Sequence, residues 1–151
     1  MSEHIFTSSL SWTRTTPDFS YETYDRGHTV TSGSGITLPS SSAPAFKGAV
    51  DRINPEEMLL AALSSCHMLT FLAVAARKRF VLERYSDDAT ALMEKNEEGK
   101  LAVTKATLRP KTTFSGEKQP TKEELAQMHH TAHNGCFIAS SVKTEVEVVL
   151  D

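Results

Sequence analysis

The sequence predicts an α+β fold. The first fifty residues are rich in Ser, Thr, aromatic residues and Gly, which favours short strands and turns. A long apolar helix follows, and after it come a hairpin pattern, a second helix and a final strand. With 151 residues, 39% of them hydrophobic, the chain has the size of a single domain, 1–151, with its own core.

Charge and cysteine content narrow the functional classes. Sixteen basic and 19 acidic side chains give a net charge of −3, so no basic excess favours a nucleic-acid partner. The N-terminus has neither the basic nor the apolar region of a signal peptide, and we expect a cytoplasmic protein. Thiols are normally kept reduced there, so the two cysteines are either inert core residues or a redox pair.

The N-terminal third is expected to form short strands. They are predicted over residues 8–13, 19–25, 28–32 and 36–38. Turns are expected at 25–27 and 32–35, where glycines follow polar residues. Residues 39–50, with two prolines and three consecutive serines, are predicted to form an ordered loop or a flexible arm.

A strong helix start follows this loop. Asn54 is suited to the N-cap, Pro55 to the first helical position, and Glu56 and Glu57 to the first turn. From Met58 to Ala76 the only ionisable side chains are those of Cys66 and His67, so the helix is apolar on nearly every face. We expect it to be buried on all sides, with a partner chain covering one face.

A transmembrane span is the competing interpretation of this helix, since about 20 apolar residues suffice to cross a bilayer. Four polar residues interrupt it, and no second span exists in the sequence. These residues are Ser64, Ser65, His67 and Thr70. We therefore expect no membrane partner.

The second half alternates strands and a helix. Residues 88–95 and 100–114 are expected to pair as a hairpin around the turn 96–99, with Pro110 at a bulge or an edge. Residues 144–150 are predicted to form a final strand.

The second helix has clear boundaries. Thr121 and Glu124 form a capping-box pattern, and Asn134-Gly135 is a stop signal. Its apolar stripe is made by Leu125, Met128 and Ala132. Cys136 comes directly after the stop.

The cysteines are the first candidates for chemistry. Cys66 lies midway along the apolar helix, and Cys136 lies in a loop, which suits a resolving role. Taken singly, each cysteine is more often a buried structural thiol than a reactive one. A reactive cysteine needs a stabilised thiolate and access to substrate.

A histidine cluster supports a metal-site hypothesis. His129 and His133 share a helix face at the i, i+4 spacing, with His130 between them and Cys136 as a possible third ligand. The Glu that metalloproteases carry after the first His is missing, as is a Cys-x-x-Cys pair. A partly solvated helix face is the more ordinary interpretation. The chain also lacks a Gly-x-Ser-x-Gly elbow, and 32–35 lacks the Lys of a phosphate loop.

Two blocks resemble a known family. The segment NPEEMLLAALSSCHMLTFLAVAARKRF, residues 54–80, is similar to the central helix of the OsmC/Ohr family. The segment AHNGCFIASSVKTEVEV, residues 132–148, is similar to its second cysteine segment. The resemblance implies an OsmC-like fold, with antiparallel sheets packed around a long buried central helix. It also implies an intertwined homodimer with shared active sites.

The resemblance further implies a function. Family members include thiol peroxidases that reduce organic hydroperoxides in oxidative stress defence. By resemblance, Cys66 is the peroxidatic cysteine, Cys136 the resolving cysteine and Glu56 the family's glutamate. The expected substrates are alkyl or fatty-acid hydroperoxides, the expected reductant is a dithiol of the lipoyl type, and no metal, haem or flavin is required. Apolar side chains along the helix favour an organic peroxide over hydrogen peroxide; they are Met58, Leu63, Met68 and Phe71.

Helix geometry limits the role of Glu56. Ten residues of continuous helix separate it from Cys66, which gives about 15 Å of rise and roughly 280° of rotation. Glu56 therefore cannot touch Cys66 of its own chain. If it serves the site, we expect it to come from the other subunit.

The sequence departs from the family at its arginine. Family members place an Arg beside the thiolate, where its positive charge lowers the thiol pKa. Residues 43–48 contain no Arg where the most similar family members have one. Arg26 is the preferred substitute, with Arg52 and Arg14 as further candidates. Without any of them, His67 or His28 would have to stabilise the thiolate.

Three alternatives to the peroxidase therefore stay open. The first is an OsmC-like binding or scavenging protein without efficient turnover, which the missing Arg favours. The others are a Cys/His metal-binding protein and a purely structural dimer.

Overall fold

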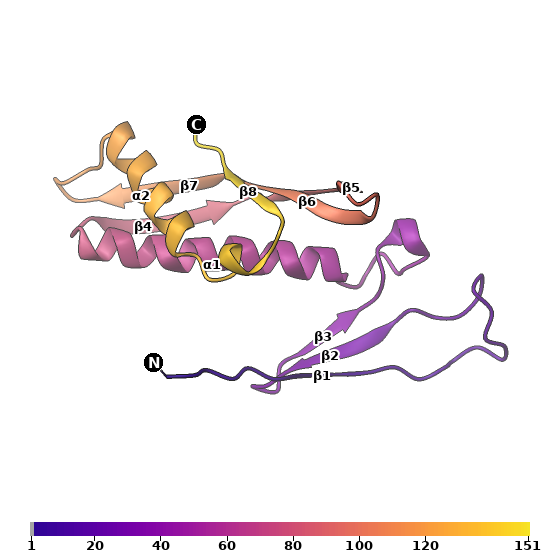
Figure 1. The fold of residues 1–151 in the computed structure, drawn as a ribbon. Coiled ribbons are helices and arrows are strands. Elements are labelled where there is room, and N and C mark those ends of the chain that lie inside the picture. Colours follow the sequence, from indigo (N-terminus) through magenta and orange to yellow (C-terminus); the bar gives the residue numbers. More distant parts are fainter. Residues whose placement is uncertain (1) are drawn as a thin grey trace. The chain divides into compact units, whose positions relative to one another are not determined.

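The computed structural model describes residues 2–151 and divides the chain into two compact units. The first unit runs to Met58, and the second runs from Leu59 to Asp151 (Figure 1). The first unit contains one sheet and the second contains two. The long helix begins in the first unit and continues in the second. The single domain expected from the sequence stays a prediction.

The first unit is built on a three-stranded antiparallel sheet. Its strands are β1 (Ser8–Ser11), β2 (His28–Ser32) and β3 (Thr37–Ser40), in the order β1-β2-β3. The turn between β2 and β3 is the predicted one. The Gly35 N–H donates to the Ser32 carbonyl at 2.9 Å, and Gly35 has a φ of 89°, which favours glycine.

The predicted strand 19–25 is wrong. These residues contain a turn, in which the N–H groups of Thr23 and Tyr24 both donate to the Ser20 carbonyl. The aromatic side chains pack against one another at tilted angles. The Phe19 and Tyr24 ring centroids lie 5.1 Å apart, and those of Phe19 and Trp12 lie 5.8 Å apart.

Two other boundaries in this unit differ from the prediction. β1 ends at Ser11, two residues before the predicted end. β3 extends to Ser40, into the segment 39–50 that the sequence predicts as loop. The loop also contains a short 3-10 helix, η1 (Pro44–Phe46), so it is ordered.

The central helix, α1 (Pro55–Arg77), begins where the sequence predicts. The Glu57 N–H donates to Asn54 Oδ1 at 2.9 Å, and the Asn54 N–H donates to Glu57 Oε1 at 3.2 Å. The helix thus has a reciprocal cap at its first turn. It ends at the basic run, where Arg79 adopts a φ of 64° and turns the chain away.

The predicted burial of α1 on all sides includes a partner chain over one face, and within this chain one stripe of the helix is buried. Its buried residues form one stripe: Leu63, His67, Phe71, Val74 and Ala75. On other faces Leu69 is 59% exposed and Leu72 is 37% exposed. The helix is long and apolar enough to cross a membrane by length and composition, but its buried stripe packs as part of a core.

The second unit has two further sheets. The strands β4 (Val81–Asp87) and β7 (Pro110–Ser115) form an antiparallel pair. The other sheet has the order β5-β6-β8 and consists of β5 (Thr90–Lys95), β6 (Leu101–Leu108) and β8 (Glu145–Val148). β5 and β6 are antiparallel, whereas β6 and β8 are parallel.

The predicted hairpin is confirmed in its first part only. Its turn is the expected one, with Asn96 Oδ1 accepting from two backbone N–H groups and Gly99 at a φ of 77°. The second strand is not continuous from 100 to 114, because the chain switches partner after Leu108. From Pro110 it pairs with β4, which the sequence analysis did not identify. Pro110 is the first residue of an edge strand, as expected for a residue without an N–H.

The second helix, α2 (Lys122–Gly135), confirms the predicted capping box. The Glu124 N–H donates to the Thr121 hydroxyl at 3.1 Å, and the Thr121 N–H donates to Glu124 Oε1 at 3.2 Å. The core of the unit lies where α2, α1 and the β4–β7 pair meet. Its buried members are Phe71, Val74, Ala75, Phe80, Met128 and Ala132.

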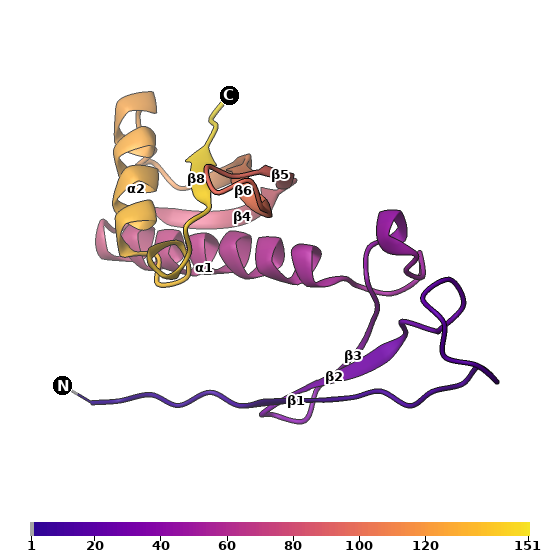
Figure 2. The same cartoon turned by 45° about the vertical axis from the view of Figure 1, so that its right-hand side comes forward.

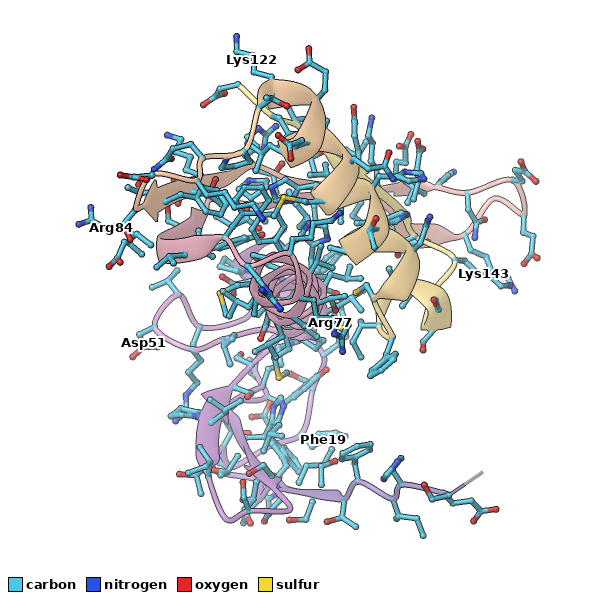
Figure 3. All side chains as sticks on the ribbon, turned by 90° about the vertical axis from the view of Figure 1, so that its left-hand side faces the viewer. Phe19, Asp51, Arg77, Arg84, Lys122 and Lys143 are labelled. Atoms are coloured by element: carbon cyan, nitrogen blue, oxygen red, sulfur yellow. The ribbon has the colours of Figure 1, made fainter. Side chains whose placement is uncertain are left out.

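The arrangement of the second unit is clear in the ribbons. α1 runs along the β4–β7 pair, and α2 crosses α1 near its C-terminal half (Figures 1 and 2). Viewed along α1, the charged side chains of Arg84, Lys122 and Lys143 lie at the periphery (Figure 3). After α2, the short 3-10 helix η2 (Ala139–Ser141) leads to β8. The predicted final strand is therefore confirmed, although it ends at Val148 rather than at residue 150.

Candidate active site

The two cysteines lie in contact in the second unit. Cys66 is in the middle of α1 and half-buried, whereas Cys136 is the residue at which α2 ends and is 2% exposed. Both are free thiols, and they lie close enough for each to shift the pKa of the other. The fold thus brings together two thiols that are 70 positions apart in the sequence.

The end of α2 is shaped to approach α1 closely. A Cβ on Gly135 would lie 3.3 Å from Thr70 Cγ2, one turn beyond Cys66 on α1. The predicted stop at Gly135 is confirmed, since α2 ends there, and Gly135 has no positive φ. Its small size matters instead, because it lets the helix end that carries Cys136 reach the Cys66 thiol.

The surroundings of Cys66 favour its thiolate. Burial acts to raise the pKa of Cys66, but hydrogen bonding from the Ile138 backbone and the Cys136 thiol outweighs it. The backbone of Phe137 and the hydroxyl of Thr70 contribute in the same direction. The net effect is a lowered pKa, which a nucleophilic cysteine needs.

Cys136 has the opposite character. Burial raises its pKa, and although hydrogen bonding from the Ala139 and Ile138 backbone lowers it, the hydrogen bond with Cys66 and the charge that Cys66 can carry raise it further. The Ala139 N–H lies 3.5 Å from the Cys136 sulfur. Cys66 therefore loses its proton first, and Cys136 remains a thiol beside it.

Phe137 and Ile138 were not identified from the sequence, because their contribution is made by backbone N–H groups. Thr70 was noted only as a polar interruption of the apolar helix. Its position, four residues after Cys66, is the signal that could have placed it on the same helix face. Its hydroxyl also donates to the Cys66 carbonyl at 2.8 Å.

Glu56 and Arg26 belong to the first unit. Glu56 lies in the first turn of α1, and since α1 is unbroken to Arg77, the same chain's Cys66 is about 15 Å further along the helix. A role for Glu56 at the thiol therefore needs another subunit. The assignment of both residues to the site stays a prediction.

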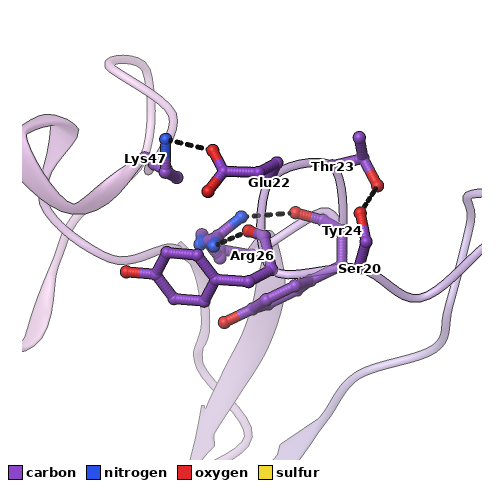
Figure 4. A network of polar contacts seen from close by, with 7 residues as sticks. Ser20, Glu22, Thr23, Tyr24, Arg26 and Lys47 are labelled. Atoms are coloured by element: carbon purple, nitrogen blue, oxygen red, sulfur yellow. Dashed lines mark hydrogen bonds and ion pairs between the residues drawn. The ribbon is translucent and has the colours of Figure 1, made fainter.

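Arg26 is held in a loop of aromatic residues. Its guanidinium lies 3.8 Å from the Tyr24 ring centroid and donates to the carbonyls of Tyr24 at 2.7 Å and Tyr21 at 2.6 Å (Figure 4). The same loop is tied by an ion pair between Lys47 and Glu22 at 2.9 Å. Among the ion pairs of residues 2–151, none involves Arg26.

The other two arginines are also bonded to backbone carbonyls of the first unit. Arg52 donates to the His28 carbonyl at 3.1 Å. Arg14 donates to the carbonyls of Thr16 and Pro17. Only Arg26 both stacks on aromatic rings and lines an apolar pocket.

This pocket lies within the first unit and has a volume of about 420 Å³. Arg26 and His28 are its basic members. The rest of its lining is mostly apolar and aromatic, and consists of Leu10, Trp12, Phe19, Tyr24, Ser41, Ser42 and Pro55. Sequence reasoning missed the pocket, because residues 8–13 and 19–25 were predicted as strands and the aromatic loop between β1 and β2 was not identified.

The histidine cluster and Cys136 were also considered as a metal site. Within residues 2–151, no three His, Cys, Asp or Glu side chains are arranged to hold a metal ion. His129 uses its Nδ1 in a hydrogen bond with His67, and His130 bonds to Asn134. Cys136 instead contacts Cys66.

Comparison with known proteins agrees with this fold. The family model described as OsmC-like protein matches residues 48–151. The structure of VCA0330, an OsmC-like protein of unknown function from Vibrio cholerae, is 41% identical over all of both chains, with a TM-score of 0.92.

Two further proteins are similar at lower identity. The uncharacterised protein YmaD of Bacillus subtilis is 24% identical over all of this chain and 95% of its own. An organic hydroperoxide resistance protein from Elizabethkingia anophelis is 18% identical, over 99% of this chain and 95% of its own. Its TM-score of 0.74 shows the same fold. With the family model matching most of the chain, the protein belongs to the OsmC-like family.

Proposed function

We propose that the protein is a thiol peroxidase that reduces organic hydroperoxides. The observation that carries the proposal is the contact between two free thiols whose pKa values are shifted in opposite directions. A nucleophilic thiolate beside a protonated resolving thiol is the arrangement that two-cysteine redox chemistry requires. Membership of a family that includes hydroperoxide resistance proteins supports it.

The first step is attack of the Cys66 thiolate on the O–O bond of the hydroperoxide. The peroxide is reduced to an alcohol, which takes up a proton, and Cys66 is oxidised to a sulfenic acid. Cys136 then attacks the Cys66 sulfur, which forms the disulfide and releases water. An external dithiol of the lipoyl type reduces this disulfide by exchange and is itself oxidised to a disulfide.

An alkyl or fatty-acid hydroperoxide is the proposed substrate class. The pocket around Arg26 is mostly apolar and aromatic, which suits a hydrocarbon chain better than hydrogen peroxide. We propose that Arg26 and Glu56 act at Cys66 within a cytoplasmic homodimer. Arg26 would stabilise the thiolate by its charge, and Glu56 would orient the guanidinium.

The central experiment follows cumene hydroperoxide consumption with dihydrolipoamide as reductant. The wild type is expected to turn over, Cys66→Ser to be inactive, and Cys136→Ser to lose multiple turnover while still reducing one equivalent. Mass spectrometry after one equivalent of peroxide should find the Cys66–Cys136 disulfide in the wild type. Absence of wild-type turnover would overturn the enzyme proposal, and equal activity of Cys66→Ser would overturn the assignment of the nucleophile.

The arginine assignment has a separate test. Arg26→Ala should raise the pKa of the Cys66 thiol and slow its reaction with peroxide, because a positive charge is lost. Arg52→Ala and Arg14→Ala are matched controls from the same unit. If Arg26→Ala leaves the pKa of Cys66 unchanged, the assignment of Arg26 is wrong. If Arg52→Ala or Arg14→Ala raises this pKa instead, then Arg52 or Arg14 is the activating arginine.

A further inference from the structure

A buried pair of histidines connects the two helices that carry the cysteines. His67 of α1 and His129 of α2 are 1% and 2% exposed, and His67 Nε2 lies 3.0 Å from His129 Nδ1. The two rings are nearly parallel, with an interplanar angle of 6° and centroids 5.2 Å apart, so they meet edge to edge through this bond. Phe71 stacks on the His129 ring at a centroid distance of 4.1 Å. The pair is therefore enclosed in the apolar core.

The pair makes one directional bond. Burial lowers the pKa of both His67 and His129 to about 4, so both are neutral at pH 7. Between two neutral imidazoles, one nitrogen donates and the other accepts, and the geometry is restricted to a short, aligned contact. In residues 2–151 this is the only side-chain hydrogen bond between α1 and α2.

The position of the pair relates it to the thiols. His67 is the residue after Cys66, and His129 is seven residues before Cys136, about two turns up the helix that ends there. Apolar packing between two helices allows small sliding and rotation, whereas a hydrogen bond of fixed direction does not. The bond therefore restricts where α2 ends relative to Cys66.

We propose that the His67–His129 bond is a positioning device for the two cysteines. It holds α2 on α1 in the register at which the Cys136 sulfur stays within reach of the Cys66 sulfur, and so raises the effective concentration of one thiol at the other. His67 and His129 act through the helices and do not touch the reacting atoms. The proposal rests on the proposed function, in which the two thiols form a disulfide.

The test measures disulfide equilibrium with glutathione, without peroxide. One oxidised glutathione oxidises the two protein thiols to a disulfide and is reduced to two glutathione molecules. The equilibrium constant gives the effective concentration of the thiol pair. Because no peroxide is used, a protein without peroxidase turnover still gives a result, and the two proposals fail separately.

Three variants make the measurement specific. His129→Leu removes the bond and is expected to lower the effective concentration about tenfold or more. His67→Leu/His129→Leu replaces both imidazoles by apolar groups, so no buried nitrogen is left unpaired and stability is better retained. His130→Asn changes the neighbouring exposed histidine and should leave the equilibrium unchanged.

The double variant separates positioning from stability. If the double variant has the unfolding temperature of the wild type but a lower effective concentration of the thiol pair, the bond acts through geometry and not through stability. His129→Gln, which keeps one hydrogen-bonding group, should recover part of the effective concentration. Wild-type equilibrium constants in folded His129→Leu or in the double variant would overturn the proposal.

Discussion

The sulfur of Cys66 differs from that of an ordinary core cysteine in the polar groups around it. Backbone N–H groups, a hydroxyl and a second thiol together outweigh the effect of burial and lower its pKa. None of these groups carries a full charge. Groups of the second unit alone therefore lower the pKa of Cys66, and the positive charge of an arginine would lower it further.

Replacement of Thr70 tests this local activation. Thr70→Val removes the hydroxyl that helps to lower the pKa of Cys66 with little change in volume, so this pKa should rise and alkylation at pH 7 should slow. The pH dependence of iodoacetamide labelling, read by mass spectrometry, measures this. Thr70→Ser keeps the hydroxyl and is the control. An unchanged labelling profile in Thr70→Val would exclude a role for the hydroxyl.

The buried histidines predict a pH dependence of stability. Both have a pKa of about 4 in the folded chain, below the value near 6.5 of an unfolded chain, so the unfolded state binds more protons below pH 6.5. Stability should be fully present above about pH 6.5. As pH falls toward 4, it should decrease by up to about 1.4 kcal/mol per pH unit for each histidine.

Urea unfolding between pH 7.5 and pH 4.5 measures this loss. The double variant His67→Leu/His129→Leu should show a shallower decrease, since it has no buried imidazole to protonate. His130→Asn should keep the wild-type slope, because His130 is exposed. Equal slopes in the wild type and the double variant would contradict the assignment.

At the scale of the elements, local signals in the sequence determine where both helices begin. The reciprocal caps at Asn54 and Thr121 each satisfy backbone N–H groups that have no partner within the helix. Such signals depend on residues three positions apart, so they could be identified without any knowledge of the fold.

Loss of the second cap gives a stability prediction. Thr121→Ala removes the acceptor of the Glu124 N–H at the start of α2 and should cost about 1 kcal/mol of unfolding free energy. Chemical denaturation measures the difference. Thr131→Ala, at an exposed position within the same helix, is the matched control and should change stability little. A cost equal to that of Thr131→Ala would mean that the cap contributes nothing.

The strands were harder to predict than the helices. Residues 19–25 have the aromatic composition of a strand but form a turn, because their rings stack on one another and around Arg26. The segment after Leu108 continues an apparent hairpin but changes partner to β4. In both cases the outcome depends on contacts with distant residues, which composition and alternation do not describe.

At the scale of the whole molecule, exposed apolar side chains predict a homodimer. Several large ones lie in the first unit: Ile5, Phe6, Leu10, Phe19 and Ile36, which are 63–91% exposed. On α1, Leu69 is 59% exposed. Apolar surface of this extent marks interaction sites in proteins of this size.

Sedimentation equilibrium should therefore give about twice the chain mass of 16.6 kDa. Leu69→Glu, which places a charge on the exposed face of α1, should shift the protein toward the monomer. Leu101→Glu, at a position that is 61% exposed near the turn 96–99, should not. A monomeric wild type would contradict the prediction, and with it the proposed role of Glu56 from a second subunit.

The sequence by itself determined the α+β class, the helix starts, the glycine turns and the two cysteines as candidates. All of these depend on short-range rules of capping, backbone conformation and composition. The tertiary structure alone decided that Cys66 contacts Cys136 and that His67 bonds to His129, 62 positions away. These contacts depend on how α2 packs on α1. The packing reflects the summed fit of many side chains, so no local pattern in the sequence specifies it.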